Sequence, residues 1–521
     1  MKNGRILIPF TALLLLFSIG AAALFAQDSG TVPALKYADP DSSILMFFDW
    51  GSLVKKGLTW DTVKGLSRNG MTYSRENLIK KMIETPSDIG IDPLKRSVVF
   101  ATFTNGNDSR ISGVIISLSD QTKLENFLKN DLGDSNSGSI KKTDSYSFIT
   151  TNTSIMGWNS DTLLILNSDA EGIDLKSEMS ELFANAGKTG RFSSQGLQKL
   201  LPEPYDISMW LSMDRLAGSA ANPGAADFFT NVEISVRLEF LQGQAVLNID
   251  STGFDTNYSF NEKKIPPALL TNLPGKTLIG FLYGTVDLNK LNDTNEAISN
   301  YMKALDAELS ALGIDKKDIS ACLGGDFLLF STDIGNKKSD IELGLSATVR
   351  DRVKLGRILT KLVKEKILIK DTKAGNVYII DNNYDKSSRM AGSIYIVLKN
   401  DKIYLASNQL KDYLLSKKTA RPAVSPELLS LANNNSVAGY VDMTGLIKKL
   451  MGNGKGEPAF AAAMIGNFFK DIRLTANQTA PDSANLRLEF NLTDDSENSL
   501  KVILDKVGSY TGGKKEENGL D

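Results

Sequence analysis

Two Gly-Lys-Thr triplets in this 521-residue chain have the residue types of a phosphate-binding loop, at positions 187–189 and 275–277. A P-loop also needs a glycine five positions before the Gly-Lys pair, because the backbone turns around the phosphates there. Leu182 and Leu270 occupy those two positions. The triplets therefore do not predict a nucleotide site.

Nucleophilic and metal chemistry are restricted because the chain has no histidine. This excludes a Ser-His-Asp triad, the usual general base near neutral pH and the commonest metal ligand. Ser52 and Lys55 have Ser-x-x-Lys spacing, and Lys188-Thr189-Gly190 resembles another element of β-lactam-binding sites. No Ser-Asp-Asn sequence accompanies them, so we interpret these matches as chance.

The segment 381–387 places oxygen-bearing side chains at positions 1, 3, 5 and 7 of a calcium-loop pattern. Such a loop needs glycine at position 6 for its sharp turn and a bidentate glutamate at position 12. Lys386 and Gly392 stand there instead. We therefore expect a polar hairpin loop and not a calcium site.

Four aspartates recur where a hydrophobic strand is followed by a short helix. The functional interpretation is an acid/base or cation site made of four carboxylates. The structural interpretation, which we favour, is that each carboxylate accepts backbone N–H groups in the first turn of its helix. The four residues are Asp49, Asp214, Asp287 and Asp442.

Cys322 is the single cysteine, which excludes an intramolecular disulfide. Its Ala-Cys-Leu-Gly-Gly surroundings favour a small buried hydrophobic residue over a reactive thiol. We therefore predict no catalytic, cofactor-binding or metal-binding residues and no cofactor.

The N-terminus has the layout of a secretory signal peptide. Lys2 and Arg5 precede an uncharged run from residue 6 to residue 26, which ends in small residues. We expect cleavage after Ala26 or Ala23 and an exported protein of the periplasm or cell envelope. The alternative is an uncleaved membrane anchor, because the run is just long enough to span a bilayer.

The rest of the chain repeats itself in order. Gly90-Ile91-Asp92 and Gly313-Ile314-Asp315 each follow an amphipathic helical pattern and precede an apolar strand. Later, residues 228–234 match residues 468–474. We therefore expect an internal duplication, with repeats at 35–265 and 266–510 after the signal peptide (1–26) and before a disordered tail (511–521).

The fold class indicated by these patterns is α+β. Strand-like runs are separated by turn signals, and single helices are interspersed among them. We expect two similar lobes of largely antiparallel sheet, with helices packed on a face. The 59 basic and 61 acidic residues nearly cancel, so no nucleic-acid partner is expected.

Several of these elements together resemble a known family. They are Asp-Ser-Ser-Ile-Leu-Met-Phe-Phe-Asp (41–49), Ile-Gly-Ile-Asp-Pro-Leu (89–94), Leu-Ser-Met-Asp-Arg-Leu (211–216) and Gly-Tyr-Val-Asp-Met (439–443). Over most of residues 38–450 the chain is similar to the domain of unknown function 4836 family of uncharacterised bacterial envelope proteins. The resemblance implies an exported envelope protein with no assigned reaction. Many members look like lipoproteins, whereas this chain lacks a lipidation cysteine.

The sequence thus predicts a non-enzymatic binding or scaffolding module, whose partner is an envelope protein or an apolar ligand. Membrane contact is expected only if the N-terminal segment is retained. The alternative is a glycosidase-like hydrolase that works outside the cytoplasm with carboxylates alone.

Overall fold

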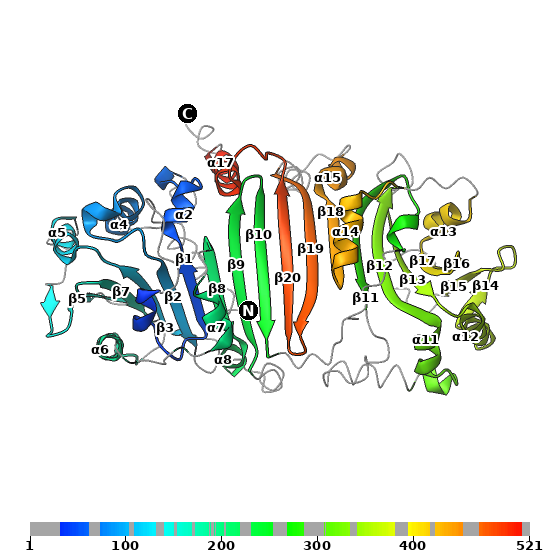
Figure 1. Cartoon of the computed structure of the whole chain (residues 1–521), viewed down its shortest axis with the longest axis horizontal. Helices are drawn as coiled ribbons and strands as arrows, with labels where there is room; N and C mark the ends of the chain where they lie inside the picture. The colour runs from blue at the N-terminus through cyan, green and yellow to red at the C-terminus, as the bar shows by residue number, and fades with distance from the viewer. Residues whose placement is uncertain are drawn as a thin grey trace, which may run out of the picture. The chain divides into compact units, whose positions relative to one another are not determined.

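The chain forms two compact units, shown in a computed structural model (Figure 1). Unit 1 comprises Met1–Phe254 and Asp494–Asp521, and unit 2 comprises Asp255–Thr493. The structure describes residues 32–512 except 62–72, 104–108, 132–139, 151–153, 169–171, 187, 189–191, 193, 203–204, 219–230, 254–267, 286–306, 308, 334–340, 381–393, 417–421 and 452–467. The predicted signal peptide and the calcium-like segment 381–387 lie outside the described residues.

The described strands of unit 1 pair in the order β4-β5-β6-β7-β3-β2-β1-β8-β9-β10, and every pairing is antiparallel. Strands that follow one another in the chain mostly pair in the sheet, because connections between strands are usually short. The strands are β1 (Ile44–Phe48), β2 (Ser97–Phe103), β3 (Ser109–Ser117), β4 (Lys141–Lys142), β5 (Ser147–Thr150), β6 (Ser154–Trp158), β7 (Thr162–Asn167), β8 (Ile207–Ser212), β9 (Glu233–Leu241) and β10 (Gln244–Thr252).

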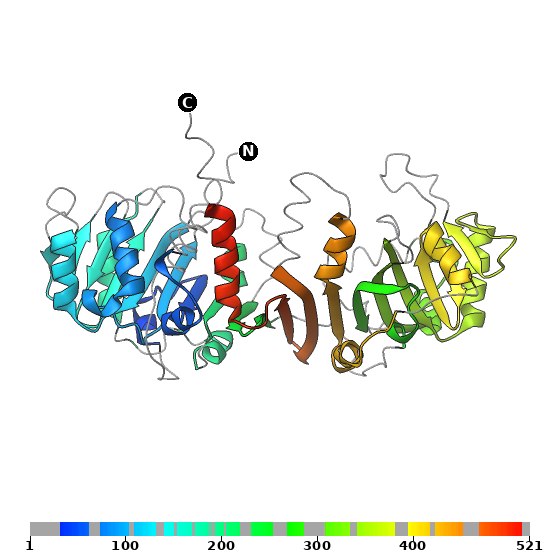
Figure 2. The same ribbon diagram turned by 90° about the horizontal axis from the view of Figure 1, so that it is seen from above.

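The helical elements of unit 1 include α4 and α5, which lie side by side in Figure 2. The elements are η1 (Pro33–Tyr37), α2 (Trp50–Lys55), α4 (Tyr73–Glu84), η2 (Pro86–Ile89), α5 (Gln121–Asp131), α6 (Leu175–Asn185), α7 (Gln195–Leu200), α8 (Met213–Gly218) and α17 (Ser499–Gly512). The apolar faces of α4 and α5 are buried, including Met82 and Leu124.

Helices cover both faces of the unit 1 sheet, whereas the sequence analysis expected helices on a single face. Two neighbours in β6 show this arrangement. A Cβ atom on Gly157 would lie 2.8 Å from Met179 Sδ of α6. Trp158 points the opposite way and donates from Nε1 to Glu125 of α5 at 3.3 Å. The sequence does hold a signal for cover on both faces, which is the unbroken apolar run 98–101 in β2. A strand that does not alternate apolar and polar residues is buried on both faces.

Unit 2 repeats this topology, with antiparallel strands in the order β14-β15-β16-β17-β13-β12-β11-β18-β19-β20. Strand for strand, the order is that of unit 1. The strands are β11 (Thr277–Thr285), β12 (Leu323–Asp333), β13 (Ile341–Val349), β14 (Leu368–Lys370), β15 (Val377–Ile380), β16 (Ile394–Lys399), β17 (Lys402–Ala406), β18 (Val437–Asp442), β19 (Phe469–Ala480) and β20 (Ser483–Leu492).

Two apolar clusters occupy the two faces of the unit 2 sheet. In one, Leu410 and Leu428 pack with strand residues such as Phe330. In the other, Leu355 and Leu359 pack against the opposite face. The helical elements are η3 (Leu270–Asn272), α11 (Lys316–Cys322), α12 (Arg352–Lys364), α13 (Asn408–Leu415), α14 (Pro426–Asn434) and α15 (Met443–Met451).

The C-terminal helix α17 belongs to unit 1, although the sequence analysis placed residues up to 510 in the second repeat. It contacts β9 and β10. Asn498, just before α17, donates from Nδ2 to the Phe240 carbonyl oxygen at 2.8 Å. The helix extends to Gly512, two residues into the predicted tail, and the residues beyond it are outside the described part.

The repeated Gly-Ile-Asp motif has the same backbone role in both units. Gly90 and Gly313 have φ angles of +75° and +60°, in the left-handed region that glycine adopts without a steric penalty. The following N–H groups, of Ile91 and Ile314, donate to the carbonyl oxygens of Pro86 and Leu309 at 2.9 and 2.8 Å. Each hydrogen bond runs from an N–H to the carbonyl oxygen five residues earlier, which is the 6→1 bond that ends a helical turn in a Schellman motif.

We predict that Gly90→Ala lowers the free energy of unfolding more than Gly172→Ala does. Both glycines have positive φ, of +75° and +82°, so each alanine incurs a backbone cost of about 1–2 kcal/mol. At Gly90 the new Cβ would also lie 1.9 Å from the Asp120 carbonyl oxygen, whereas nothing lies within 4 Å at Gly172. Steric overlap adds roughly 1–3 kcal/mol. Urea denaturation of both variants measures the difference, and equal losses would contradict the argument.

Candidate functional site

An apolar cavity of about 300 Å³ lies between sheet and helices in unit 2. Almost all of its lining side chains are hydrocarbon, with one hydroxyl residue and one thiol residue among them. The lining residues are Ile319, Cys322, Leu323, Phe327, Leu345, Ser346, Ala347, Leu355, Ile358, Leu359, Leu362, Ile403 and Leu405. Its size is at the lower end of the range for small-molecule sites.

The floor of the cavity is formed by cross-strand rows on one face of the sheet. Phe327 pairs with Ala347, which pairs with Ile403 on the next strand. Leu345 pairs with Leu405 in the adjacent row. Directly opposed side chains in antiparallel strands lie close together on the same face. The small Ala347 therefore leaves a low point between two larger neighbours.

The roof is the apolar face of α12, and α11 closes one end. Residues 355, 358, 359 and 362 follow helical spacing and share one face. Leu355 and Leu359 are buried, but Ile358 and Leu362 remain half-buried. In unit 1 the matching helix α5 buries Leu124 and Leu128 completely. The apolar face of α12 in unit 2 is thus less deeply buried than that of α5 in unit 1.

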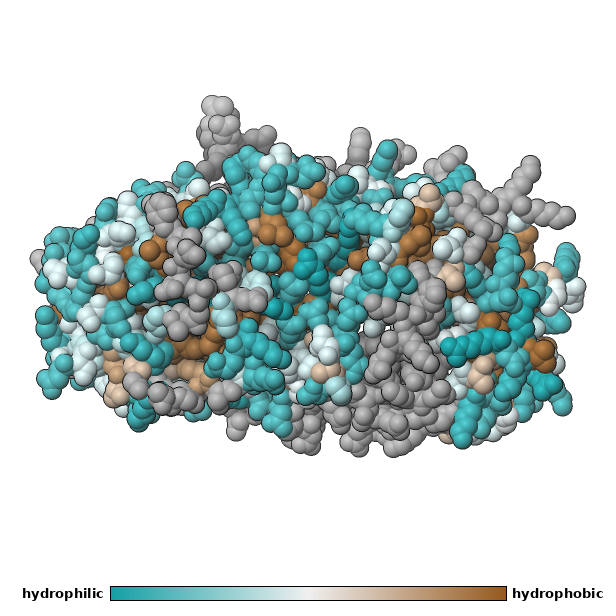
Figure 3. All heavy atoms as spheres, in the orientation of Figure 1, coloured by the Kyte–Doolittle hydropathy of each residue, from teal (hydrophilic) through white to brown (hydrophobic). Residues whose placement is uncertain are grey.

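The apolar floor continues outward beyond the cavity. Leu343 precedes Leu345 by two residues in β13, so both point to the same face, and Leu329 lies opposite Leu345 on β12. All three are exposed, Leu343 at 62%. Figure 3 shows hydrophobic residues as separate spots among hydrophilic ones in the part of unit 2 that holds these strands. These three exposed leucines continue the apolar floor beyond the cavity.

Cys322 lines this cavity as a buried, neutral thiol. The side chain is fully buried, and its Sγ donates to the Ile319 carbonyl oxygen at 3.2 Å. Burial raises the pKa of the thiol, since the thiolate would lose its hydration. The prediction of a small buried hydrophobic residue is confirmed.

Two of the four predicted aspartate caps are seen as caps. Asp49 accepts a hydrogen bond from the Ser52 N–H at 2.9 Å, at the start of α2. Asp442 accepts from the Gly445 N–H at 2.8 Å, at the start of α15. Asp214 lies inside α8 and accepts from the Arg215 N–H and the Ser212 hydroxyl. Asp287 is outside the described residues.

The second Gly-Lys-Thr triplet opens a strand, which confirms that it is no P-loop. Gly275 has a φ of +132°, the Lys276 N–H donates to the Asp333 carbonyl oxygen at 2.7 Å, and β11 begins at Thr277. A P-loop would lead into a helix. Gly187 and Thr189 of the first triplet are outside the described residues.

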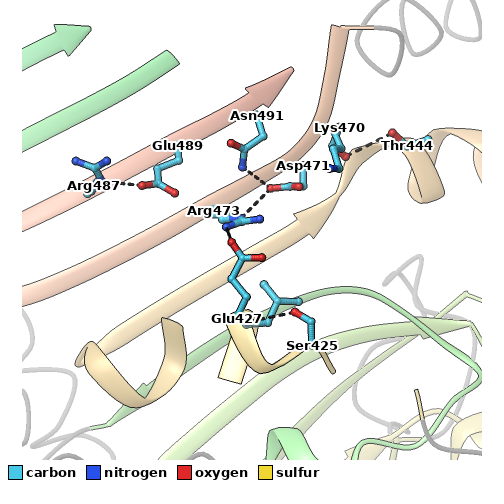
Figure 4. Close-up of polar contacts among 10 residues, drawn as sticks. Ser425, Glu427, Thr444, Lys470, Asp471, Arg473, Arg487, Glu489 and Asn491 are labelled. Carbon is cyan, nitrogen blue, oxygen red and sulfur yellow. Dashed lines mark hydrogen bonds and ion pairs between the residues drawn. The ribbon is translucent and has the colours of Figure 1, made fainter. Parts of the chain in front are cut away.

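A polar cluster in unit 2 joins the β19–β20 hairpin to α14 (Figure 4). Asp471 is buried and accepts from Arg473 Nε at 3.0 Å and from Asn491 Nδ2 at 2.6 Å. Arg473 also donates from Nη1 to Glu427, near the start of α14. Burial alone would lower the pKa of Arg473, but its bond to Glu427 and the charges of Asp471 and Glu427 raise it. The guanidinium therefore stays charged between two carboxylates, as a structural link.

Further polar groups lie beside this cluster. Arg487 pairs with Glu489 at 2.8 Å on β20. Burial raises the pKa of the neighbouring Tyr440 to about 12, with the charge of Asp442 adding to the shift. In the described part of the chain, no three His, Cys, Asp or Glu residues are grouped as a metal ion would need. Likewise, no described helix has the length and hydrophobicity of a membrane-spanning segment.

The fold and the cavity define an α+β protein with two antiparallel units, one of which has an apolar cavity between its sheet and its helices. The chain belongs to the family described as Domain of unknown function (DUF4836), whose pattern matches residues 64–425. The family resemblance expected from the sequence is therefore confirmed. No curated protein matches the chain.

Solved structures with some similarity include crystal forms IV, III and I of TP0453. The TM-scores are 0.30, 0.28 and 0.27, at 7%, 9% and 7% identity. The matches cover 43%, 48% and 43% of this chain and 81%, 89% and 79% of the other. Similarity at this level supports no conclusion about this chain.

We predict that the Cys322 thiol reacts slowly in the folded protein. A buried thiol with a raised pKa has little thiolate near neutral pH, and thiolate is the reactive form. With Ellman's reagent at neutral pH, we expect a rate at least about 100-fold below that of free cysteine. In denaturant, Cys322 should react at the free-cysteine rate. Rapid labelling of the folded chain would contradict this placement.

Proposed function

We propose that this chain is an exported, non-catalytic binding protein of the cell envelope, whose unit 2 binds an aliphatic ligand chain. The observation that carries the proposal is the cavity under α12, whose lining is almost purely hydrocarbon. Each methylene transferred from water into such a lining contributes about 0.8 kcal/mol. Ser346 and Cys322 offer little for recognising a polar group, so an alkyl chain fits the lining best.

The carboxylate-dependent hydrolase suggested as an alternative has less support. It needs two facing carboxyl groups roughly 5–10 Å apart across a bound sugar. No carboxylate lines the apolar cavity. In the polar cluster, Asp471 and Glu427 are both engaged by Arg473. Both carboxylates are thus occupied in the structural link between the β19–β20 hairpin and α14.

Export and location rest on the sequence of residues 1–26, with its short basic start, uncharged run and small residues at the end. Family membership is consistent with this expectation. The occupant of the cavity would then be a component of the envelope or a compound that passes through it. A partner protein that inserts an apolar side chain remains the alternative occupant.

The two units are proposed to descend from one duplicated ancestor. The support is the identical strand order over ten strands in each unit and the shared Gly-Ile-Asp turn. Under this proposal, the cavity reflects divergence of unit 2, because its helix α12 is less deeply packed than α5 of unit 1.

We predict that a fluorescent polyene fatty acid such as cis-parinaric acid binds the purified chain at one site. Ala347→Met should fill the low point of the floor, because a methionine side chain adapts to the space available. Excluding about two methylenes of the ligand should weaken binding on the order of tenfold. Fluorescence titration measures the affinity of both proteins.

The control for this titration is Leu94→Ser, which removes an exposed leucine in unit 1. Its affinity for the probe should equal that of the unaltered chain. Equal binding by the unaltered chain and Ala347→Met would show that the probe occupies another place. Absence of binding would overturn the aliphatic-ligand proposal.

We also predict that the protein isolated from its host's envelope lacks residues 1–26. Small residues at the end of the uncharged run favour cleavage there. Native mass spectrometry gives the mass of the mature chain and of any retained ligand in one measurement. A mass that includes the N-terminal segment would mean a membrane-anchored protein.

A further inference from the structure

The segment from Arg352 to Lys373 concentrates positive charge in a chain whose net charge is −2. It forms α12, the following turn and β14, and it contains eight basic residues against two acidic ones. Because the basic residues are separated by one to three others, no run of like charge is visible in the sequence. They are Arg352, Lys354, Arg357, Lys361, Lys364, Lys366, Lys370 and Lys373.

The outward side of α12 is the side opposite the cavity. Val353, Arg357, Thr360 and Lys364 are spaced by four, three and four residues, so they share that side, and all four are exposed. Leu355 and Leu359 hold the inward side against the sheet. One helix thus presents hydrocarbon to the cavity and positive charge to the exterior.

Most of this charge is not neutralised by neighbouring groups. Arg352 lies 3.5 Å from Asp401, Lys354 lies 4.0 Å from Asp318, and Lys361 donates to the Gly313 carbonyl oxygen. The other five basic residues have no ion pair with another residue in the described ranges. They are Arg357, Lys364, Lys366, Lys370 and Lys373.

Exposed aliphatic side chains stand among these charges. Val353, Ile367 and Ile369 are 65%, 41% and 49% exposed. Val353 lies on the outward side of α12, and the two isoleucines lie in the turn and in β14, the last strand in the sheet order. We call Val353, Ile367 and the exposed Arg352, Arg357, Lys364, Lys366, Lys370 and Lys373 the basic surface. Ile369 follows the buried Leu368 in β14 and therefore points to the opposite face of the sheet.

We propose that the basic surface docks the protein onto a bilayer that contains anionic lipid. Exposed Lys and Arg side chains are attracted to the phosphate head groups of anionic lipids. The exposed Val353 and Ile367 stand among these charges and would contact the acyl boundary. The proposal does not require an occupied cavity, so it goes beyond the proposed ligand binding and can fail separately.

A bilayer fits these residues better than other anionic partners do. Single-stranded nucleic acid is held by basic residues interleaved with aromatic ones on which bases stack. The exposed apolar residues here are valine and isoleucine, which offer no stacking face. An ordinary solvated helix would alternate its charges at four-residue spacing, whereas Glu365 is the one exposed acid in the segment.

The test is co-sedimentation of the full chain with two kinds of vesicle, phosphatidylcholine alone and phosphatidylcholine mixed with phosphatidylglycerol, at about 0.1 M salt. The full chain is used throughout, so the N-terminal segment contributes equally to every comparison. We expect stronger binding to the anionic vesicles. Arg357→Gln, Lys364→Gln and Lys366→Gln combined should weaken that binding roughly fivefold per residue, on the order of 100-fold together. Binding to neutral vesicles should not change.

The matched control combines Lys81→Gln, Lys129→Gln and Lys199→Gln. It removes the same charge from exposed positions on α4, α5 and α7 of unit 1, and it should bind anionic vesicles like the unaltered chain. Both triple variants change exposed residues, so their thermal midpoints should stay close to that of the unaltered chain. Both should also bind the polyene fatty acid normally, which separates this proposal from the cavity.

Three outcomes would overturn the docking proposal. The first is equal vesicle binding by the two triple variants. The second is competition by free inorganic phosphate at constant ionic strength, which would make the surface a phosphate site. The third is absence of binding to the anionic vesicles. At about 1 M salt the Debye length shortens to roughly 3 Å, so loss of vesicle binding there would support the docking proposal.

Discussion

Central strands that are apolar on both faces determine the architecture of each unit. Val98 to Ala101 offer no polar face to water, so the sheet must be covered on both sides. Helices from the connecting segments supply that cover, and the antiparallel order keeps most connections short. The cavity follows from the same requirement. In unit 2 the described cover over Ala347 and Ile403 includes α12, whose Ile358 and Leu362 are only half-buried. The candidate site therefore lies where, among the described residues, α11 and α12 meet one face of this sheet.

Much of the fold was predictable from local patterns. The apolar faces of α5 and α12, the strands β3 and β13 and the repeated Gly-Ile-Asp turns all follow from residue spacing. Cover on both faces differs from the expectation of helices on one face, and the unbroken apolar run in β2 carries the signal for it. The cavity was not predictable, because spacing identifies a buried face but not whether facing volumes fill the space. Ala347 is unremarkable in the sequence and matters only through its neighbours Phe327 and Ile403.

Helix α12 illustrates how helical spacing gathers charges that are spread out along the sequence. Arg357 and Lys364 are seven residues apart in the chain, yet two helical turns bring them onto one side. Counting runs of like charge misses such a pattern. The same helix carries Leu355 and Leu359 on its other side, so ligand chemistry inside and charge outside depend on one amphipathic element. Any shift of α12 away from the sheet would change both surfaces together.

The return of α17 to unit 1 has a consequence for synthesis. Residues 499–512 are the last described part of the chain to be made, yet they contact β9 and β10, whose residues precede all of unit 2. A ribosome therefore completes unit 2 while unit 1 still lacks a helix, and domains fold as they emerge. During that interval the partly folded unit exposes the surface that Leu500, Val502 and Leu504 later help to bury. In this chain the order of translation is not the order in which the units can be finished.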